Sequence, residues 1–314
     1  MMNQKNGRVA IFVLALLFLT IAIVNPVSAG PAISPTMTAS RNFAVLASTA
    51  ITGTAAITGD VGIGPAGGGA GITALTCAMV TGKIYTPDPA GPSGPCHVAN
   101  SALPGAALTD LSANVFVQLG GEACDVTYGG VQNLGGLTLV PGVYCDSSGF
   151  TINTGETLTL SGGPGNVWVF KTPSSTLTTL ANSKVVGGDP CNVWWDVGSS
   201  ASLGTSSELT GSILAGTGTI AVGTGATVNG RVMSSIAAVT FAGGGGVTLD
   251  CPIVPVTVTT VLESSASGGV TILTSVVLTI PIQAVVPEYQ WGVWLLLILM
   301  LPSYMLLKKR MCSR

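Results

Sequence analysis

Charged and chemically reactive side chains are scarce in this sequence. Only 8% of its 314 residues are Asp, Glu, Lys or Arg, and His97 is its single histidine. Thirteen acids lie between Asp60 and Glu288 but only five basic residues lie between Arg41 and Arg231, so this part has a net charge near −8 (5 − 13). Nucleic-acid binding needs a basic stripe, and this function class is therefore excluded.

Patterns for metal binding, phosphate binding and catalysis are also missing. The cysteines form no C-x-x-C pair, and Gly243–Gly246 lacks the Lys-Ser/Thr of a phosphate-binding loop. A Ser-His-Asp triad would have to use His97, which adjoins Cys96. A polysaccharide-degrading enzyme is the alternative enzyme class, but it needs clustered carboxylates and the acids here occur singly. The sequence predicts no enzyme, no cofactor and no metal site.

Glycine and β-branched residues dominate what is present, and they recur with a fixed period. Within Gly204–Ser234, Gly211 recurs 19 residues later as Gly230 (230 − 211), and Ile213-Leu214 recurs as Val232-Met233. A period of about 20 residues is typical of a solenoid. An extended chain of that length spans about 60 Å, which is enough for three short strands and three corners. We therefore predict a β-solenoid.

One helix is expected to interrupt the strand pattern. Residues 41–65 predict a first coil and residues 64–98 a loop rich in Gly, Pro and Ala. Strand signals return from Leu134 onward, about every 8–12 residues. Between these parts, Asn100–Leu119 has apolar residues at helical spacing, and Gly120-Gly121 follows it.

Both ends of the chain combine apolar runs with basic residues. Residues 1–29 have a basic start, an apolar core and a small-residue site before Gly30, which predicts a signal peptide, with a retained anchor as the alternative. Residues 252–290 predict a Thr/Val-rich stalk, which is either a spacer or one last hairpin. Residues 291–307 are an uncharged run followed by the basic tail 308–314, which predicts a transmembrane helix and a cytoplasmic tail.

Export would favour disulfides among the six cysteines before residue 252. Several connectivities are open to an even set of cysteines. We expect the cysteines to pair in chain order. The first two disulfides would each close a loop of about 20 residues and contribute about 3 kcal/mol to the stability of the folded protein. The expected pairs are Cys77–Cys96, Cys124–Cys145 and Cys191–Cys251.

Threonine and glycine recur together at intervals along the predicted coils. Thr154–Thr157 and Thr224–Thr227 share the pattern T-G-x-T, and looser versions occur at Thr52–Thr54, Leu180–Ser183 and Thr205–Glu208. Stacked strands lie about 4.8 Å apart, so these segments would form a flat array of hydroxyl and methyl groups. Such an array could match another lattice through many weak contacts. The alternative is that threonine simply suits a solvated strand.

Several ordered motifs resemble the microbial ice-binding domain family. They lie within residues 41–251 and comprise Phe43–Ala47, Ile57–Gly62, Leu134–Tyr144, Cys191–Ala201 and Gly223–Arg231. The resemblance implies an all-β fold, namely a discontinuous, right-handed parallel β-solenoid of triangular cross-section with one long α-helix packed alongside.

The resemblance also implies a flat, ice-binding sheet face. The positions that it indicates are Thr52, Thr54, Thr154, Thr157, Ser183, Thr205, Ser207, Thr224 and Thr227. Glu156 and Glu208 depart from the pattern, because charged side chains would disturb ordered water on such a face.

A second resemblance concerns the C-terminal part. Pro287-Glu288-Tyr289, the apolar run and Lys308-Lys309-Arg310 are similar to sorting signals processed by exosortase-type proteases. A plain membrane anchor is the alternative.

Taken together, these features predict a non-enzymatic ice-binding, or antifreeze, protein exposed at the cell surface. Its predicted partners are ice or ordered water, the membrane through residues 291–307, and a sorting protease. The alternative is a cell-surface adhesion or structural domain with the same fold and no ice activity, and ice affinity separates the two.

Overall fold

A computed structural model describes residues 31–251, 255–260 and 276–281. The predicted signal peptide, apolar run and basic tail lie outside the described residues. Of the predicted stalk, β25 (Pro255–Thr260) and β26 (Val276–Pro281) pair as antiparallel strands. Within the described ranges, no helix is long and apolar enough to cross a membrane.

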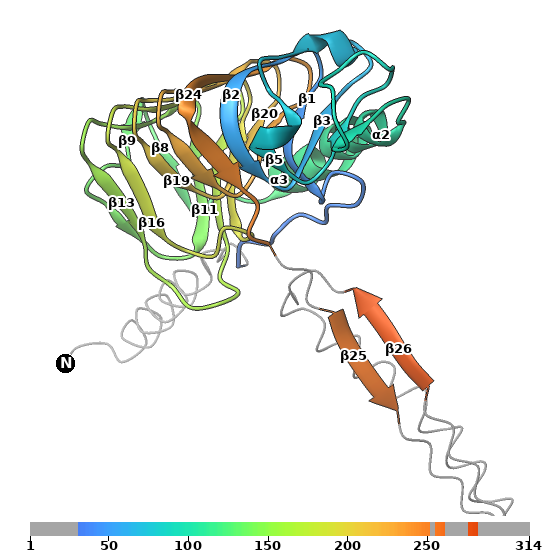
Figure 1. Ribbon diagram of the computed structural model, residues 1–314. Helices are drawn as coiled ribbons and strands as arrows, with labels where there is room; N and C mark the ends of the chain where they lie inside the picture. The colour runs from blue at the N-terminus through green and yellow to red at the C-terminus, as the bar shows by residue number, and fades with distance from the viewer. Residues whose placement is uncertain (1–30, 252–254, 261–275, 282–314) are drawn as a thin grey trace, which may run out of the picture.

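Residues 43–248 wind into a β-solenoid with three sheet faces (Figure 1). The first, face A, is a ten-stranded parallel sheet. In spatial order it consists of β7 (His97–Val98), β6 (Ile84–Tyr85), β3 (Asp60–Ile63), β1 (Phe43–Ala47), β23 (Val232–Ser234), β20 (Ser212–Ala215), β17 (Val193–Val197), β14 (Trp168–Thr172), β11 (Gly142–Asp146) and β8 (Val126–Tyr128).

The other two faces share two long strands, β24 (Val239–Thr248) and β2 (Ile51–Thr58), which run across the corner between them. Face B consists of β9 (Gln132–Asn133), β12 (Phe150–Ile152), β15 (Leu177–Thr179), β18 (Ala201–Leu203), β21 (Ile220–Val222), the first halves of β24 and β2, and β4 (Ile72–Thr73). Face C consists of β10 (Thr138–Leu139), β13 (Thr157–Leu160), β16 (Lys184–Gly187), β19 (Glu208–Thr210), β22 (Thr227–Asn229), the second halves of β24 and β2, and β5 (Val80–Thr81).

The 19-residue repeat corresponds to stacking of successive coils. Ile213 pairs with Val232 and Leu214 with Met233 in parallel register. The recurring glycine has a steric cause, because a Cβ atom on Gly230 would collide with the carbonyl oxygen of Gly211 in the coil beside it. The predicted solenoid period is confirmed at these residues.

The coils do not stack in chain order. Val45 of β1 pairs on one side with Val61 of β3 and on the other with Val232 of β23. After β7 the chain enters a helix and resumes at β8, at the opposite end of face A. The N-terminal coils therefore extend the C-terminal end of the stack.

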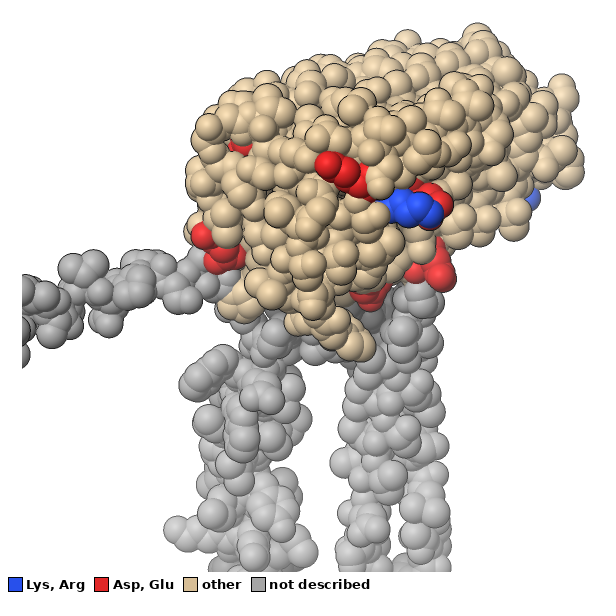
Figure 2. Space-filling model, turned by 90° about the vertical axis from the view of Figure 1, so that its left-hand side faces the viewer, with Lys and Arg blue, Asp and Glu red and all other residues tan. Residues whose placement is uncertain are grey.

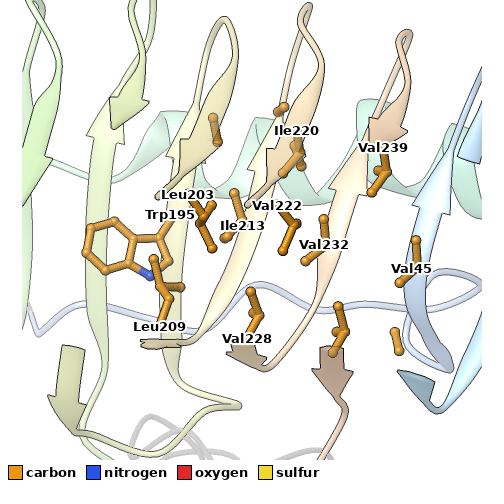
Figure 3. Close-up of a cluster of buried hydrophobic side chains, with 14 of the residues drawn as sticks. Val45, Trp195, Leu203, Leu209, Ile213, Ile220, Val222, Val228, Val232 and Val239 are labelled. Carbon is orange, nitrogen blue, oxygen red and sulfur yellow. The ribbon is translucent and has the colours of Figure 1, made fainter. Parts of the chain in front are cut away.

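Apolar side chains of all three faces fill the interior of the solenoid (Figure 3). Aromatic rings stack along face A, with ring centroids 5.4 Å apart for Tyr144 and Phe170 and 4.1 Å apart for Phe170 and Trp195. Trp195 occupies the coil next to that of Phe170, so each ring packs directly on the ring of the preceding coil. This packing holds the coils in one register.

The helix lies along the outer side of face A (Figure 1). It comprises α2 (Leu103–Asp110), the π-helical turn η3 (Leu111–Val115) and α3 (Phe116–Gly121). The predicted helix, Asn100–Leu119, is confirmed with bounds shifted by two to three residues. Four of its buried apolar side chains pack on outward-facing residues of face A; they are Ala107, Leu111, Val115 and Leu119.

The prediction of a loop over residues 64–98 was wrong in part. This stretch contains β4, β5, β6 and β7, together with the 3-10 helices η1 (Gly69–Gly71) and η2 (Cys77–Met79). Each of its strands has only two residues. Strands this short between Gly and Pro leave no alternation in the sequence, so the pattern could not show them.

The three predicted disulfides are confirmed. The bonds are Cys77–Cys96, Cys124–Cys145 and Cys191–Cys251. The third closes the longest loop, with a sequence separation of 60 residues, and joins the end of the solenoid to the coil that begins with β17.

Residues 31–40 are held against the helix by hydrogen bonds. The buried Asp110 carboxylate accepts bonds from the backbone N–H and hydroxyl groups of both Thr38 and Ser40, at 2.6–3.0 Å. It also accepts one from Asn114. Burial alone would raise the pKa of Asp110, but these bonds outweigh it and lower the pKa to about 2.

We predict that Asp110→Ala destabilises the protein by about 2–4 kcal/mol, because buried N–H and O–H donors lose their acceptor. The parent should lose this stabilisation as the pH falls from about 3.8, the ordinary value, towards 2, because the folded-state pKa is depressed. Urea unfolding at neutral and acidic pH measures both effects. Asp110→Asn keeps one acceptor oxygen and should cost less; equal stability of the parent and both variants would contradict the prediction.

A second pH effect of opposite sign is expected from Asp196. This residue is buried beside Lys171 in register, and burial raises its pKa from 3.8 to about 6 although Lys171 lowers it. The folded state therefore keeps a proton that the unfolded state has lost, so stability should fall by at most about 3 kcal/mol as the pH rises from 3.8 to 6. Asp196→Asn should flatten the dependence of melting temperature on pH in this window, and an unchanged slope would refute the assignment.

Candidate functional site

Two of the three faces are open to a ligand. Face A is covered by the helix and by residues 31–40. Faces B and C have no such cover from the described residues in Figure 1. A surface that meets an extended ligand must therefore lie on face B, on face C or on the corner between them.

Face B presents one row of small side chains in register. Phe150 and Ile152 of β12 point inward and are buried, while Thr151 between them is partly exposed. The same alternation repeats on the neighbouring strands, about 4.8 Å apart. In spatial order the row is Asn133, Thr151, Thr178, Ser202, Ala221, Thr240, Thr52 and Thr73.

The strand segments of face B contain no charged residue. Figure 2 shows one side of the molecule, on which charged side chains form small groups within an otherwise uncharged surface. Near face B, Glu156 is half-buried and accepts a hydrogen bond from Asn133 at 2.7 Å. Face B is thus a regular and nearly uncharged sheet surface.

Face C differs because it contains an ion pair. Lys184 and Glu208 lie opposite each other on adjacent strands, and Nζ of Lys184 is 2.8 Å from Oε1 of Glu208. Thr157 pairs with Lys184 on one side and Thr227 pairs with Glu208 on the other. The ion pair therefore lies between two threonines in one row, and the row continues from Thr227 to Gly246 and Ala56.

The nine predicted positions fall into four groups. Thr52 and Thr54 lie on face B, and Thr157 and Thr227 lie on face C. The exposed Thr154, Thr205 and Thr224 lie at the corner between these faces. The remaining two, Ser183 and Ser207, follow the corner. The structure does not bring all nine positions onto one flat face.

Corner geometry accounts for the T-G-x-T pattern. Four of these segments contain one residue with a left-handed backbone at the corner, with φ of +70° at Gly155, +57° at Asn182, +55° at Ser206 and +68° at Gly225. Glycine adopts this conformation without strain, and asparagine adopts it more readily than most residues. The motif therefore marks where the chain turns from face B to face C.

Ser183 and Ser207 are not surface residues, which corrects their inclusion among the candidate positions. Each follows a left-handed residue, which turns its side chain inward, and each is only 1% exposed. The Ser183 hydroxyl donates to the carbonyl of Leu180 at 2.7 Å, and the Ser207 hydroxyl has no hydrogen-bond partner among the described residues. Neither can contact a flat external surface.

Most of the face B row was missed by the sequence analysis. The missed residues are Asn133, Thr151, Thr178, Ser202, Ala221, Thr240 and Thr73. The available signal was a small residue between two buried apolar ones, as in Phe150-Thr151-Ile152 and Ala201-Ser202-Leu203. This signal is weak, because each strand contributes only one residue to the row.

His97, the single histidine, contacts a threonine hydroxyl. Nε2 of His97 is 2.7 Å from the hydroxyl of Thr86, in the segment that precedes the helix. In the described part of the chain, no three His, Cys, Asp or Glu side chains lie close enough to hold a metal ion.

Comparison with known proteins identifies the family. The model of the Ice-binding-like family matches residues 45–244. This chain belongs to the ice-binding-like family. The match covers most of the solenoid, from β1 into β24.

Relatives of this family are similar in sequence. An ice-binding protein of Flavobacterium frigoris is 34% identical over 200 residues, which cover 62% of this chain and 70% of that protein. An ice-binding protein of a Colwellia species is 35% identical over 201 residues, with coverage of 62% and 76%.

Solved structures of the family support the fold. The crystal structure of an ice-binding protein from Antarctomyces psychrotrophicus has a TM-score of 0.56 and 31% identity, and covers 69% of this chain and 98% of that chain. The predicted all-β, right-handed discontinuous solenoid with one helix alongside is confirmed. The relatives compared are named for ice binding and not for an enzymatic reaction.

We predict that Ser207→Ala leaves the protein as stable as the parent or more stable by up to about 1 kcal/mol, since it removes a buried hydroxyl for which the described ranges provide no partner. Ser183→Ala is the matched control and should cost about 1 kcal/mol, because it loses a hydrogen bond to Leu180. Urea unfolding measures both. A marked loss of stability in Ser207→Ala alone would show that its hydroxyl has a partner.

Proposed function

We propose that the protein adsorbs to ice through face B and thereby inhibits ice growth or recrystallisation. The observation that carries this proposal is the row Asn133, Thr151, Thr178, Ser202, Ala221, Thr240, Thr52 and Thr73, which lies in register on an open sheet face without charged residues. The names of the relatives agree with this function.

The physical basis is the number and regularity of weak contacts. A single threonine offers one hydroxyl and one methyl group, and neither binds ordered water tightly. Of the eight positions in the row, five are threonines that present both groups, and the strands that carry the row are about 4.8 Å apart on a rigid support. Because the strands are already ordered, adsorption orders few additional groups, and the small contributions act together.

The threonines predicted from the sequence lie in this surface, at its edge or beyond it. Thr52 belongs to the row itself and Thr54 follows it on the same strand, so both are retained in the proposed site. Thr154, Thr205 and Thr224 are exposed at its edge, where they could extend the contact area. Thr157 and Thr227 lie on face C, beyond the corner.

We propose further that the domain acts outside the cell and catalyses no reaction. Three disulfides suit an oxidising compartment, and residues 1–29 have the composition of an export signal. Residues 291–307 would then attach the protein to the membrane, either permanently or until a sorting protease cuts the C-terminal part.

We predict that Thr178→Tyr and Thr240→Tyr each abolish most ice activity, because a bulky ring on face B prevents close contact along the row. Ice-crystal shaping and recrystallisation inhibition measure the effect on the oxidised protein. Thr157→Tyr on face C is the matched control and should keep the parent activity.

Three results would contradict this assignment in different ways. No activity in the folded parent would refute ice binding and favour the structural or adhesion role. If only Thr157→Tyr loses ice activity, the ice-binding site lies on face C. Thr224→Tyr is a further variant, and if only this variant loses ice activity, the site lies at the corner. Circular dichroism of each variant checks that the solenoid is folded.

A further inference from the structure

Face C carries a second row of small residues that resembles the row on face B. The first three members pair with one another, and so do the last five; continuing the register of the Lys184–Glu208 pair by two residues along the same strands brings Val186 opposite Thr210. Most of the members are threonines. In spatial order the row is Thr138, Thr159, Val186, Thr210, Asn229, Thr248, Thr58 and Thr81. In residue type and strand spacing, face C is therefore close to a second copy of face B.

The ion pair is the main difference between the two faces. Lys184 and Glu208 lie in the adjacent row, between Thr157 and Thr227. Their side chains are 45% and 55% exposed, so both project from the sheet. The remaining strand segments of face C contain no other charged residue.

The Lys184–Glu208 pair is not explained by a contribution to the stability of the fold. Exposed ion pairs contribute little to folding free energy, because water already solvates both charges well. Both residues are at outward positions of short strands, where threonine would fit equally well. The consequence of the pair lies in the surface that it creates.

We propose that the Lys184–Glu208 pair determines which face binds ice, by excluding face C and confining adsorption to face B. Charged groups orient their hydration water around themselves, and removing that water is costly. The longer side chains also rise above the neighbouring threonines and keep a flat lattice at a distance. The protein then binds only the ice planes that match face B. This inference rests on the proposed ice binding.

The test is a double variant, Lys184→Thr with Glu208→Thr, which removes both charges and extends the threonine row from Thr157 to Thr227. A fluorescently labelled full chain is adsorbed to a single-crystal ice hemisphere, and the planes that it decorates are recorded. We expect the parent to decorate one set of planes and the double variant to decorate an additional set. In a Thr178→Tyr background, the two substitutions should restore recrystallisation inhibition that the tyrosine had removed.

The matched control is the exchange Lys184→Glu with Glu208→Lys, which keeps two charges on face C and should leave the plane pattern of the parent unchanged. A folded double variant that decorates only the parent planes, or an exchange variant that gains the new planes, would overturn the proposal while ice binding by face B stands. A parent that decorates no plane would instead remove the proposed function, and this inference with it. Melting curves establish that each variant is folded.

Discussion

The architecture depends on in-register parallel pairing between coils. No coil of this chain can bury its apolar face alone, so each strand is stable only between two neighbours. Trp195 illustrates the constraint: it is flanked by Phe170 in the preceding coil and by Ile213 in the next, and it is fully buried. The register that stacks these side chains inside the solenoid also aligns the outward-facing residues, so a regular surface follows directly from a regular core.

The three faces share this order but differ in what covers or interrupts them. Face A is closed by the helix, whose C-terminal end receives the Lys171 ammonium group through bonds to the carbonyls of Gly120 and Glu122. Face C is open but carries the Lys184–Glu208 pair. Face B is open and its strands are uncharged. One folding pattern thus produces three surfaces of different character, and a few side chains decide which of them can meet an extended ligand.

Sequence reasoning found the features that are local or strictly periodic. The solenoid was visible because Ile213 and Val232 occupy equivalent places one period apart, and the helix was visible because its apolar residues recur within a few positions. The face B row was hidden because the coils differ in length: Thr151 and Thr178 are 27 residues apart (178 − 151), whereas Ser202 and Ala221 are 19 apart (221 − 202). Ser183 and Ser207 were misplaced because a left-handed residue before each one reverses the inward and outward alternation of a strand. That reversal depends on backbone torsion angles, which a pattern of residue types does not record.

The position of β1 between β3 and β23 has a consequence for how the molecule is made. Val45 is synthesised 187 residues before its partner Val232 (232 − 45), so during synthesis the first coil waits with one edge unpaired. Contacts this distant in sequence close late and make folding slow, since a long loop must be ordered before they form. A chain whose first strand is enclosed only after residue 232 has been made stays unfolded for longer, which would suit the export proposed above.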